Sequence, residues 1–103
     1  MITSDNFPRL SHKEFTVLEM LVNNDEMYGL EMVTASEGEL KRGTVYITLQ
    51  RMAEKGLVDS RVEIRIEPEI GIPRRWYKVS EFGRKIFKAQ ELALRYLQIN
   101  LRI

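Results

Sequence analysis

The segment 41–56 (KRGTVYITLQRMAEKG) constrains the fold most, because its apolar residues recur at helical spacing. Three of them share one side and predict an amphipathic helix over 41–55 that packs against a core: Val45, Leu49 and Met52. The opposite arc is mostly polar. Lys41 and Arg42 fall in the predicted first turn, where the helix dipole favours acidic residues. An anionic partner explains basic residues there better than helix stability does, and an ordinary surface helix is the alternative.

Length and composition indicate one small globular domain of 103 residues. The sequence has no cysteine, which excludes disulfides and thiolate metal sites and fits a reducing cytoplasm. No apolar run approaches the roughly 20 residues that a bilayer-spanning helix needs, and no signal-peptide pattern opens the chain. We therefore expect a soluble, cytoplasmic protein that does not interact with membranes. The single histidine, His12, is expected to be solvated rather than to bind a metal.

The net charge of +1 conceals a strong separation of charge along the chain. Residues 1–40 contain two basic and eight acidic residues, whereas residues 41–103 contain fourteen basic and seven acidic residues. Such a separation is typical of a protein with a nucleic-acid-binding surface, although chance clustering on a solvated surface gives the same pattern.

The N-terminal third of the chain predicts an arm and two helices. Residues 1–10 are expected to form a loose arm, and Ser11 and Glu14 have the spacing of a capping box for a helix over about 12–22. Its apolar face is Phe15, Leu18, Leu21 and Val22. A shorter helix is predicted over 28–36, with Leu30, Met32 and Val33 facing inward and Gly38 just beyond its end. With the helix over 41–55 this pair forms a candidate helix-turn-helix.

After residue 56 the period of the sequence changes from helix to strand. Val62, Ile64 and Ile66 alternate with charged residues, which predicts a half-buried strand, and a Pro- and Gly-containing loop follows. A returning strand over 74–79 completes a predicted antiparallel hairpin over 57–79. Arg74 and Arg75 lie at the base of this hairpin.

The chain ends in a predicted helix that begins after Ser80, a plausible N-cap. Its stretch 92–103 (LALRYLQINLRI) is more apolar than a lone surface helix should be, which indicates a partner. We expect a homodimer rather than a helix folded back on its own domain. The residues expected at the dimer interface are Phe87, Leu94, Leu97 and Leu101.

This order of elements predicts an α+β, mainly helical fold: a winged helix-turn-helix of three helices and a two-stranded wing, followed by a dimerisation helix. The boundaries are 1–10 for the arm, 11–79 for the DNA-binding domain and 80–103 for the dimerisation helix. The helix over 41–55 would read the major groove of double-stranded DNA. The expected DNA-binding residues are Lys41, Arg42, Gly43, Thr44, Tyr46, Ile47, Gln50, Arg51, Lys55, Arg74 and Arg75.

Several motifs resemble those of the PadR family of transcriptional regulators, in the same order along residues 15–88. Residues 28–31 (YGLE) are similar to its YGYE-like second helix, and residues 43–46 (GTVY) to its GTLY-type recognition helix. Residues 54–58 (EKGLV) match the EKGLI that ends that helix, and residues 75–84 (RWYKVSEFGR) match the RxYYxLTExGR-like join to the last helix.

The resemblance implies a dimeric winged-helix DNA-binding protein, usually a repressor, with the C-terminal helix in the dimer interface. The chain departs from the family at Ile47, where the family often has proline, and its wing loop carries Glu67 and Glu69. The tip of the wing should therefore bind phosphate less well than its base. The C-terminal helix is short, so any small-molecule effector would have to bind at the dimer interface, and no residue identifies one.

Other functions are less well supported by the residues. The glycines are scattered rather than gathered in a phosphate loop, and no HExxH or GxSxG occurs, so we expect neither an enzyme nor a cofactor. Trp76 and Tyr77 are expected in the core, Gly29 is expected to permit close packing, and Tyr46 is expected to pack partly while reaching a phosphate. The alternatives are a winged-helix module that binds an acidic protein, and a small ligand-binding dimer without DNA contacts.

Overall fold

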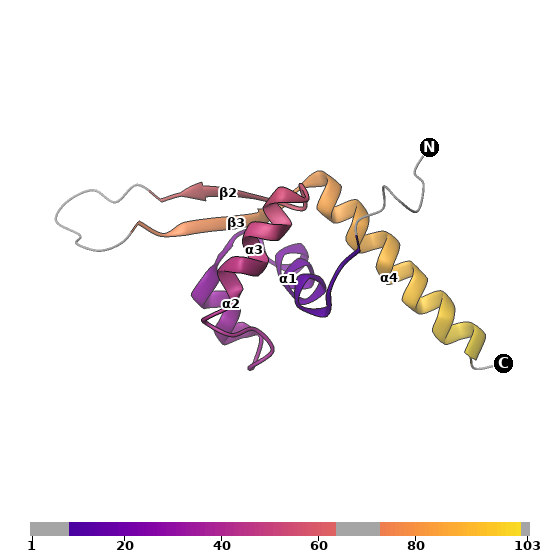
Figure 1. The fold of residues 1–103 in the computed structure, drawn as a ribbon. Coiled ribbons are helices and arrows are strands. Elements are labelled where there is room, and N and C mark those ends of the chain that lie inside the picture. Colours follow the sequence, from indigo (N-terminus) through magenta and orange to yellow (C-terminus); the bar gives the residue numbers. More distant parts are fainter. Residues whose placement is uncertain (1–8, 64–72, 102–103) are drawn as a thin grey trace.

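The computed structural model describes residues 9–63 and 73–101, with side chains up to residue 98, and confirms the α+β, mainly helical fold (Figure 1). The predicted arm is therefore described only at Arg9 and Leu10. The elements in chain order are α1 (His12–Asn23), β1 (Met27–Tyr28), α2 (Gly29–Ala35), α3 (Val45–Glu54), β2 (Val58–Val62), β3 (Arg75–Val79) and α4 (Glu81–Leu101).

Helix α1 begins with the predicted capping box. The Glu14 backbone N–H donates to Ser11 Oγ at 3.2 Å, and the Ser11 N–H donates to Glu14 Oε1 at 2.9 Å. These two bonds satisfy donors that a helix start otherwise leaves unpaired. The helix ends at Asn23, one residue beyond the predicted end.

The sheet has one strand more than the sequence predicts. Its order is β1-β3-β2, with both pairs antiparallel, so the predicted hairpin is confirmed and β1 adds to the far edge of β3. Trp76 lies at the centre of one cross-strand row, opposite Tyr28 on one side and Arg61 on the other. The expected start of the second helix at Tyr28 is therefore wrong, because this residue ends β1 and caps α2.

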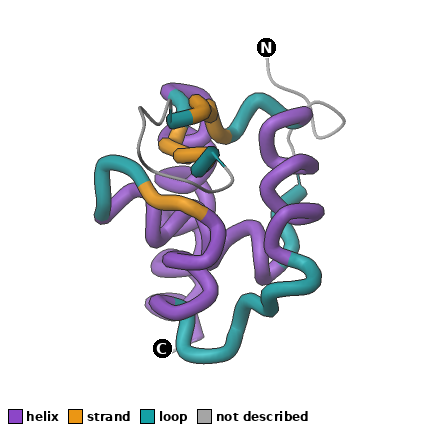
Figure 2. Tube along the Cα trace, turned by 90° about the vertical axis from the view of Figure 1, so that its left-hand side faces the viewer, coloured by secondary structure: helices purple, strands orange, loops and turns teal. Residues whose placement is uncertain are grey.

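One hydrophobic core joins the helices to the inner face of the sheet. In Figure 2, which looks along the hairpin, the helices lie below and beside the strands. Tyr77 is in this core, as predicted, whereas Trp76 is only partly buried and lies on the other face of β3. The core residues are Val17, Leu18, Leu21, Met27, Met32, Leu40, Val45, Leu49, Met52, Leu57, Val58, Tyr77, Ile86 and Phe87.

Two further predictions about burial are wrong. Leu30 is 37% exposed, since it lies two residues from the fully buried Met32 and so about 200° away around the helix. Val62 is 44% exposed, and only Val58 of β2 is buried. The strand continues past the body of the protein into the wing, where no helix covers it (Figure 1). The predicted strand positions Ile64 and Ile66 lie outside the described residues.

Helix α4 starts against the hairpin and then leaves the body of the protein (Figure 1). Ser80 caps it, as predicted, because its Oγ accepts from the Gly83 N–H at 2.9 Å. Ile86 and Phe87 are buried, whereas the larger apolar residues further along the helix are exposed: Leu92, Leu94, Tyr96 and Leu97. None of the helices in the described part of the chain combines the length and apolar character that a bilayer crossing requires.

Candidate nucleic-acid interface

The start of the predicted recognition helix needs a correction. Helix α3 begins at Val45 rather than at residue 41, and Lys41 to Thr44 form the turn that leads into it. The Lys41 carbonyl accepts from the N–H groups of Thr44 at 3.1 Å and Val45 at 2.9 Å. The two cations of this turn therefore immediately precede the helix rather than lie within its first turn.

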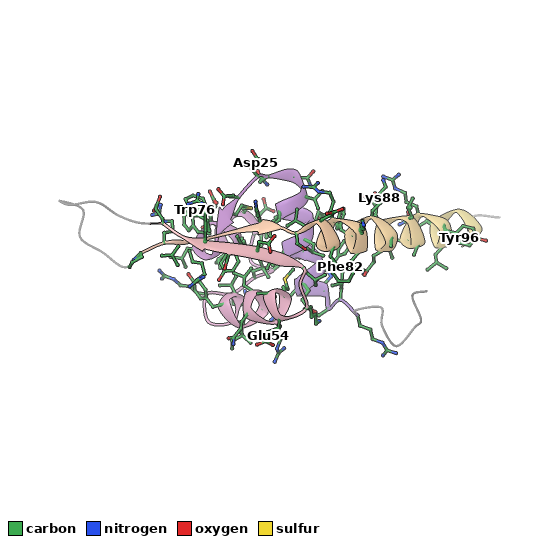
Figure 3. All side chains as sticks on the ribbon, turned by 90° about the horizontal axis from the view of Figure 1, so that it is seen from above. Asp25, Glu54, Trp76, Phe82, Lys88 and Tyr96 are labelled. Atoms are coloured by element: carbon green, nitrogen blue, oxygen red, sulfur yellow. The ribbon has the colours of Figure 1, made fainter. Side chains whose placement is uncertain are left out.

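The two faces of α3 are divided as the sequence predicts. Val45, Leu49 and Met52 are fully buried, and Thr48 joins them with its hydroxyl donating to the Thr44 carbonyl at 3.2 Å. The outer arc is exposed at four positions that the sequence assigns to DNA: Tyr46, Ile47, Gln50 and Arg51. Figure 3 shows Glu54, at the end of this arc, pointing away from the body of the protein.

Tyr46 combines packing with exposure. Its ring lies against the backbone of Gly29, where an added Cβ would come within 2.7 Å of the ring, and yet half of the residue is exposed. Gly29 therefore permits close packing, as predicted. The contact fixes the direction in which the Tyr46 hydroxyl projects from α3.

Lys55 makes contacts within the protein that the sequence does not predict. Its ammonium lies 2.8 Å from Glu14 Oε2 and 3.0 Å from Oε1, and it also donates to the Arg9 carbonyl at 3.0 Å. These contacts tie the end of α3 to the start of α1. A charge neutralised in this way is poorly placed to bind phosphate, so we leave Lys55 out of the interface proposed below.

The two arginines at the base of the wing lie on opposite faces of the hairpin. The Arg74 guanidinium stacks on the Tyr28 ring, 4.3 Å from its centroid, whereas Arg75 donates to Ser60 Oγ at 3.1 Å. Arg75 is exposed, and Arg74 is partly covered. The wing residues Glu67 and Glu69, for which the sequence predicts weak phosphate binding, lie outside the described residues.

A cleft of about 560 Å³ separates the base of the wing from α3. It is lined by Tyr28, Gly29, Leu30, Tyr46, Pro73, Arg74 and Arg75. Tyr28 and Leu30 are absent from the predicted interface. The sequence assigns both to a helix facing the core, and only the pairing of β1 with β3 shows that Tyr28 lies beside the wing.

The outer face of the sheet carries a cluster of aromatic and basic side chains around Trp76. The Tyr28 and Trp76 rings meet edge to face at 5.1 Å, and Arg61 lies 5.8 Å from the Trp76 ring. Arg61 also makes two hydrogen bonds of 2.8 Å to the Glu26 carboxylate. These bonds lower the pKa of Glu26 and raise that of Arg61. The cluster braces the wing against β1.

The residues predicted for the dimer interface divide into three groups. Phe87 is buried within its own protomer, stacked on Phe15 with ring centroids 5.1 Å apart, which leaves it little surface for the predicted interface. Leu94 and Leu97 are exposed on the projecting part of α4. Leu101 lies beyond the residues whose side chains are described.

The described residues contain no group of histidine, cysteine and acidic side chains that could hold a metal ion. His12 is exposed, as predicted, and its Nε2 lies 3.2 Å from Glu39 Oε2.

Helices α1 to α3, the hairpin of β2 and β3, and the exposed arc of α3 together define a winged helix-turn-helix protein. The chain belongs to the transcriptional regulator PadR-like family, whose family model matches residues 17–89. This confirms the resemblance seen in the sequence. Members of the family are transcription regulators, and the protein is not an enzyme. No curated protein matches the sequence.

Solved structures share this fold. A PadR family transcription regulator from Clostridium difficile R20291 has a TM-score of 0.73 at 22% identity, and the match covers 89% of this chain and 96% of that one. A PadR-like regulator from Bacillus cereus ATCC 14579 has a TM-score of 0.66 at 17% identity, covering 86% of each chain. PadR from Bacillus subtilis, in complex with operator DNA, has a TM-score of 0.65 at 16% identity, covering 75% of this chain and 45% of that one.

Proposed function

We propose that this protein is a sequence-specific, double-stranded DNA-binding regulator that acts as a homodimer and represses transcription. The observation that carries the proposal is the outer arc of α3, which is exposed along its length and preceded by a cationic turn. The major groove of B-DNA is wide enough for an α-helix. Bacillus subtilis PadR, which shares the fold, has been solved with operator DNA, and this supports the same use of the fold here.

The exposed residues suit two kinds of contact. Lys41 and Arg42 are exposed and are proposed to bind phosphates beside the groove, and such contacts supply affinity that depends on salt but not on sequence. Base edges are proposed to be contacted by Thr44 at the start of α3 and by three residues of the helix itself, which together offer polar and apolar groups: Ile47, Gln50 and Arg51. Gly43 has open space around it and lets the backbone approach the DNA.

The base of the wing adds a second contact beside the first. Arg75 is exposed and is proposed to bind the neighbouring backbone or enter the minor groove, while Arg74 is held by its stacking on Tyr28 and positions the wing. Tyr46 is proposed to donate its hydroxyl to a phosphate. The exposed apolar part of α4 is proposed to hold two protomers together, and a dimer on its operator represses by blocking access of other proteins. Such a regulator acts in the compartment that holds the DNA, which agrees with the cytoplasm expected from the sequence.

The proposal is tested by selecting duplexes from a random pool with the purified protein. We expect enrichment of one sequence family, and binding that weakens steeply between about 50 and 200 mM salt. Arg51→Ala should weaken binding to the selected duplex and reduce the discrimination between that duplex and random DNA. Arg42→Ala should weaken binding to both and reduce the salt slope of the dimer by about 2, because each of its two protomers would neutralise one phosphate fewer.

Lys78→Ala is the matched control, since Lys78 is exposed and lines a cleft with Asp25. Figure 3 shows Asp25 on the side of the protein opposite to Glu54 of α3. This variant should bind DNA almost as the unchanged protein does. Failure to enrich any duplex, or affinity that does not change with salt, would contradict the proposal and favour a winged-helix module that binds a protein.

A further inference from the structure

We propose that Ile47 reads the C5-methyl group of a pyrimidine, which in unmodified DNA means thymine. This inference rests on the proposed function, and it assigns a base-specific role to one side chain of α3. Ile47 is 52% exposed at the centre of the outer arc and is its one exposed aliphatic residue, since Tyr46 beside it is aromatic and Gln50 and Arg51 are polar.

Ile47 contributes little to the protomer itself. It lies two residues from both Val45 and Leu49, so it points away from the stripe that packs into the core. Isoleucine is also a weaker helix former than Lys, Arg, Gln or Glu, because its branched side chain restricts χ1 in a helix. Neither packing nor helix propensity therefore accounts for an isoleucine at this position.

The surroundings of Ile47 leave room for a base edge. Helical side chains tilt towards the N-terminus, so Ile47 extends over the turn that contains Gly43. An added Cβ at Gly43 would meet no atom within 4 Å, which means that the protein does not fill this space. One turn further on, Gln50 and Arg51 are exposed and can donate hydrogen bonds to neighbouring bases.

Thymine is the base that offers an apolar group to such a surface. In the major groove the other three bases present hydrogen-bond donors and acceptors, whereas thymine also presents its methyl group. Burying a single methyl-sized group corresponds to roughly a fourfold change in affinity, and to about fifteenfold when both half-sites of a dimer lose it. An effect of this size is measurable by direct titration.

The test replaces each thymine of the selected duplex in turn by deoxyuridine, which removes the methyl group and keeps every hydrogen-bonding group. Dissociation constants are measured by fluorescence polarisation for the unchanged protein, Ile47→Val and Ile47→Ala. We expect one thymine position per half-site at which deoxyuridine weakens binding roughly fourfold in the unchanged protein. The loss should be smaller in Ile47→Val and close to nothing in Ile47→Ala.

Gln50→Ala is the control on the same arc. It should alter affinity while keeping the full sensitivity to deoxyuridine at the same position. The inference is overturned if no thymine position responds, or if the response is unchanged in Ile47→Ala. Either result leaves the proposed function intact, since the protein would still bind its selected duplex. Failure to bind any duplex would instead contradict the proposed function.

Discussion

Gly83 shows how one position can join two elements. An added Cβ there would overlap the Leu57 carbonyl oxygen, which also accepts from the Ser80 N–H at 3.0 Å. The start of α4 therefore lies directly against the start of the hairpin. Glycine destabilises a helix, so its presence here suggests that another part of the chain packs closely against this position. The structure shows that this part is the backbone of Leu57.

We predict that Gly83→Ala destabilises the protein. Alanine would gain about 1 kcal/mol from its helix propensity. The overlap is with a backbone oxygen that no side-chain rotation can relieve, so we expect the cost to outweigh this gain and the net loss to be about 1–3 kcal/mol. The measurement is thermal unfolding followed by circular dichroism at fixed protein concentration, with a fall of several degrees expected.

Gly43→Ala is the control for this substitution, because a Cβ at Gly43 meets nothing within 4 Å. It should leave the unfolding temperature almost unchanged. Equal stability of Gly83→Ala and the unchanged protein would show that α4 does not approach the hairpin as closely as described.

The ion pair between Glu14 and Lys55 predicts a dependence of stability on pH. Burial raises the pKa of Glu14, but hydrogen bonds from Lys55 and Ser11 together outweigh it, so the pKa lies below its ordinary value of 4.5. Because the folded-state pKa is the lower one, the stabilisation is present above the unfolded-state value and is lost as the pH falls through the folded-state value.

We therefore expect Glu14→Gln to lower the free energy of unfolding by about 1.5–3 kcal/mol near pH 7, the range for a hydrogen bond to a charged group. The difference from the unchanged protein should shrink as the pH falls below about 4.5. Urea unfolding at a series of pH values measures both effects. Glu39→Gln, at an exposed ion pair with His12, should change stability little. A constant difference at every pH would contradict the assignment.

At the scale of elements, the length of a helix or strand determines whether the sequence pattern can predict it. The predicted bounds are close to the observed ones for the long periodic helices α1, α3 and α4. The predicted start of α3 is too early because the sequence pattern does not distinguish the preceding turn from a helix. Strand β1 has two residues and therefore no period of its own. It forms because β3 offers a free edge, and this partner lies nearly fifty residues further along the chain.

The candidate site, too, could be predicted only in part. The exposure of the outer arc of α3 follows from its buried stripe, so the arc could be predicted from periodicity alone. The ion pair between Lys55 and Glu14 could not be predicted from periodicity, because it joins the end of α3 to the start of α1. The cluster around Trp76 was missed for the same reason, because it depends on the cross-strand row that includes Tyr28 and Arg61.

Trp76 is the single tryptophan of the chain, so its fluorescence reports on the base of the wing. The Arg74 guanidinium covers the Tyr28 ring and lies 6.0 Å from the centre of the Trp76 ring. We predict that Arg74→Ala opens this cluster to water, shifts the emission to longer wavelength and increases quenching by acrylamide. Arg75→Ala, on the other face of the hairpin, should have little effect. Equal quenching in both variants would contradict the described cluster.

At the scale of the whole molecule, the surface proposed to bind DNA and the surface proposed to pair lie apart. Helix α3 and the wing lie at one end, and the apolar second half of α4 projects from the other (Figure 1). The sequence predicted the order of these parts. It did not predict where α4 leaves the body, because this depends on the stacking of Phe87 on Phe15, which joins α4 to α1. The first half of α4 therefore completes the core, and the second half extends beyond it with exposed apolar residues.

The last prediction concerns that pairing. Leu97→Glu places a carboxylate in the exposed apolar surface of α4, and burial of an unpaired charge is costly enough to prevent association. We expect the unchanged protein to have about twice the chain mass of 12.1 kDa by light scattering, and the variant to have the mass of one chain. Arg95→Glu, two residues away on another side of the helix, should remain dimeric.

The same variant tests whether dimerisation sets the DNA site. A dimer should select an inverted repeat with half-site centres about one helical turn, roughly 34–36 Å, or a multiple of it apart. The monomeric variant should lose its preference for that spacing and show about half the salt slope, because it neutralises about half as many phosphates. A monomeric variant that keeps full affinity and spacing would show that α4 does not hold the two DNA-binding surfaces together.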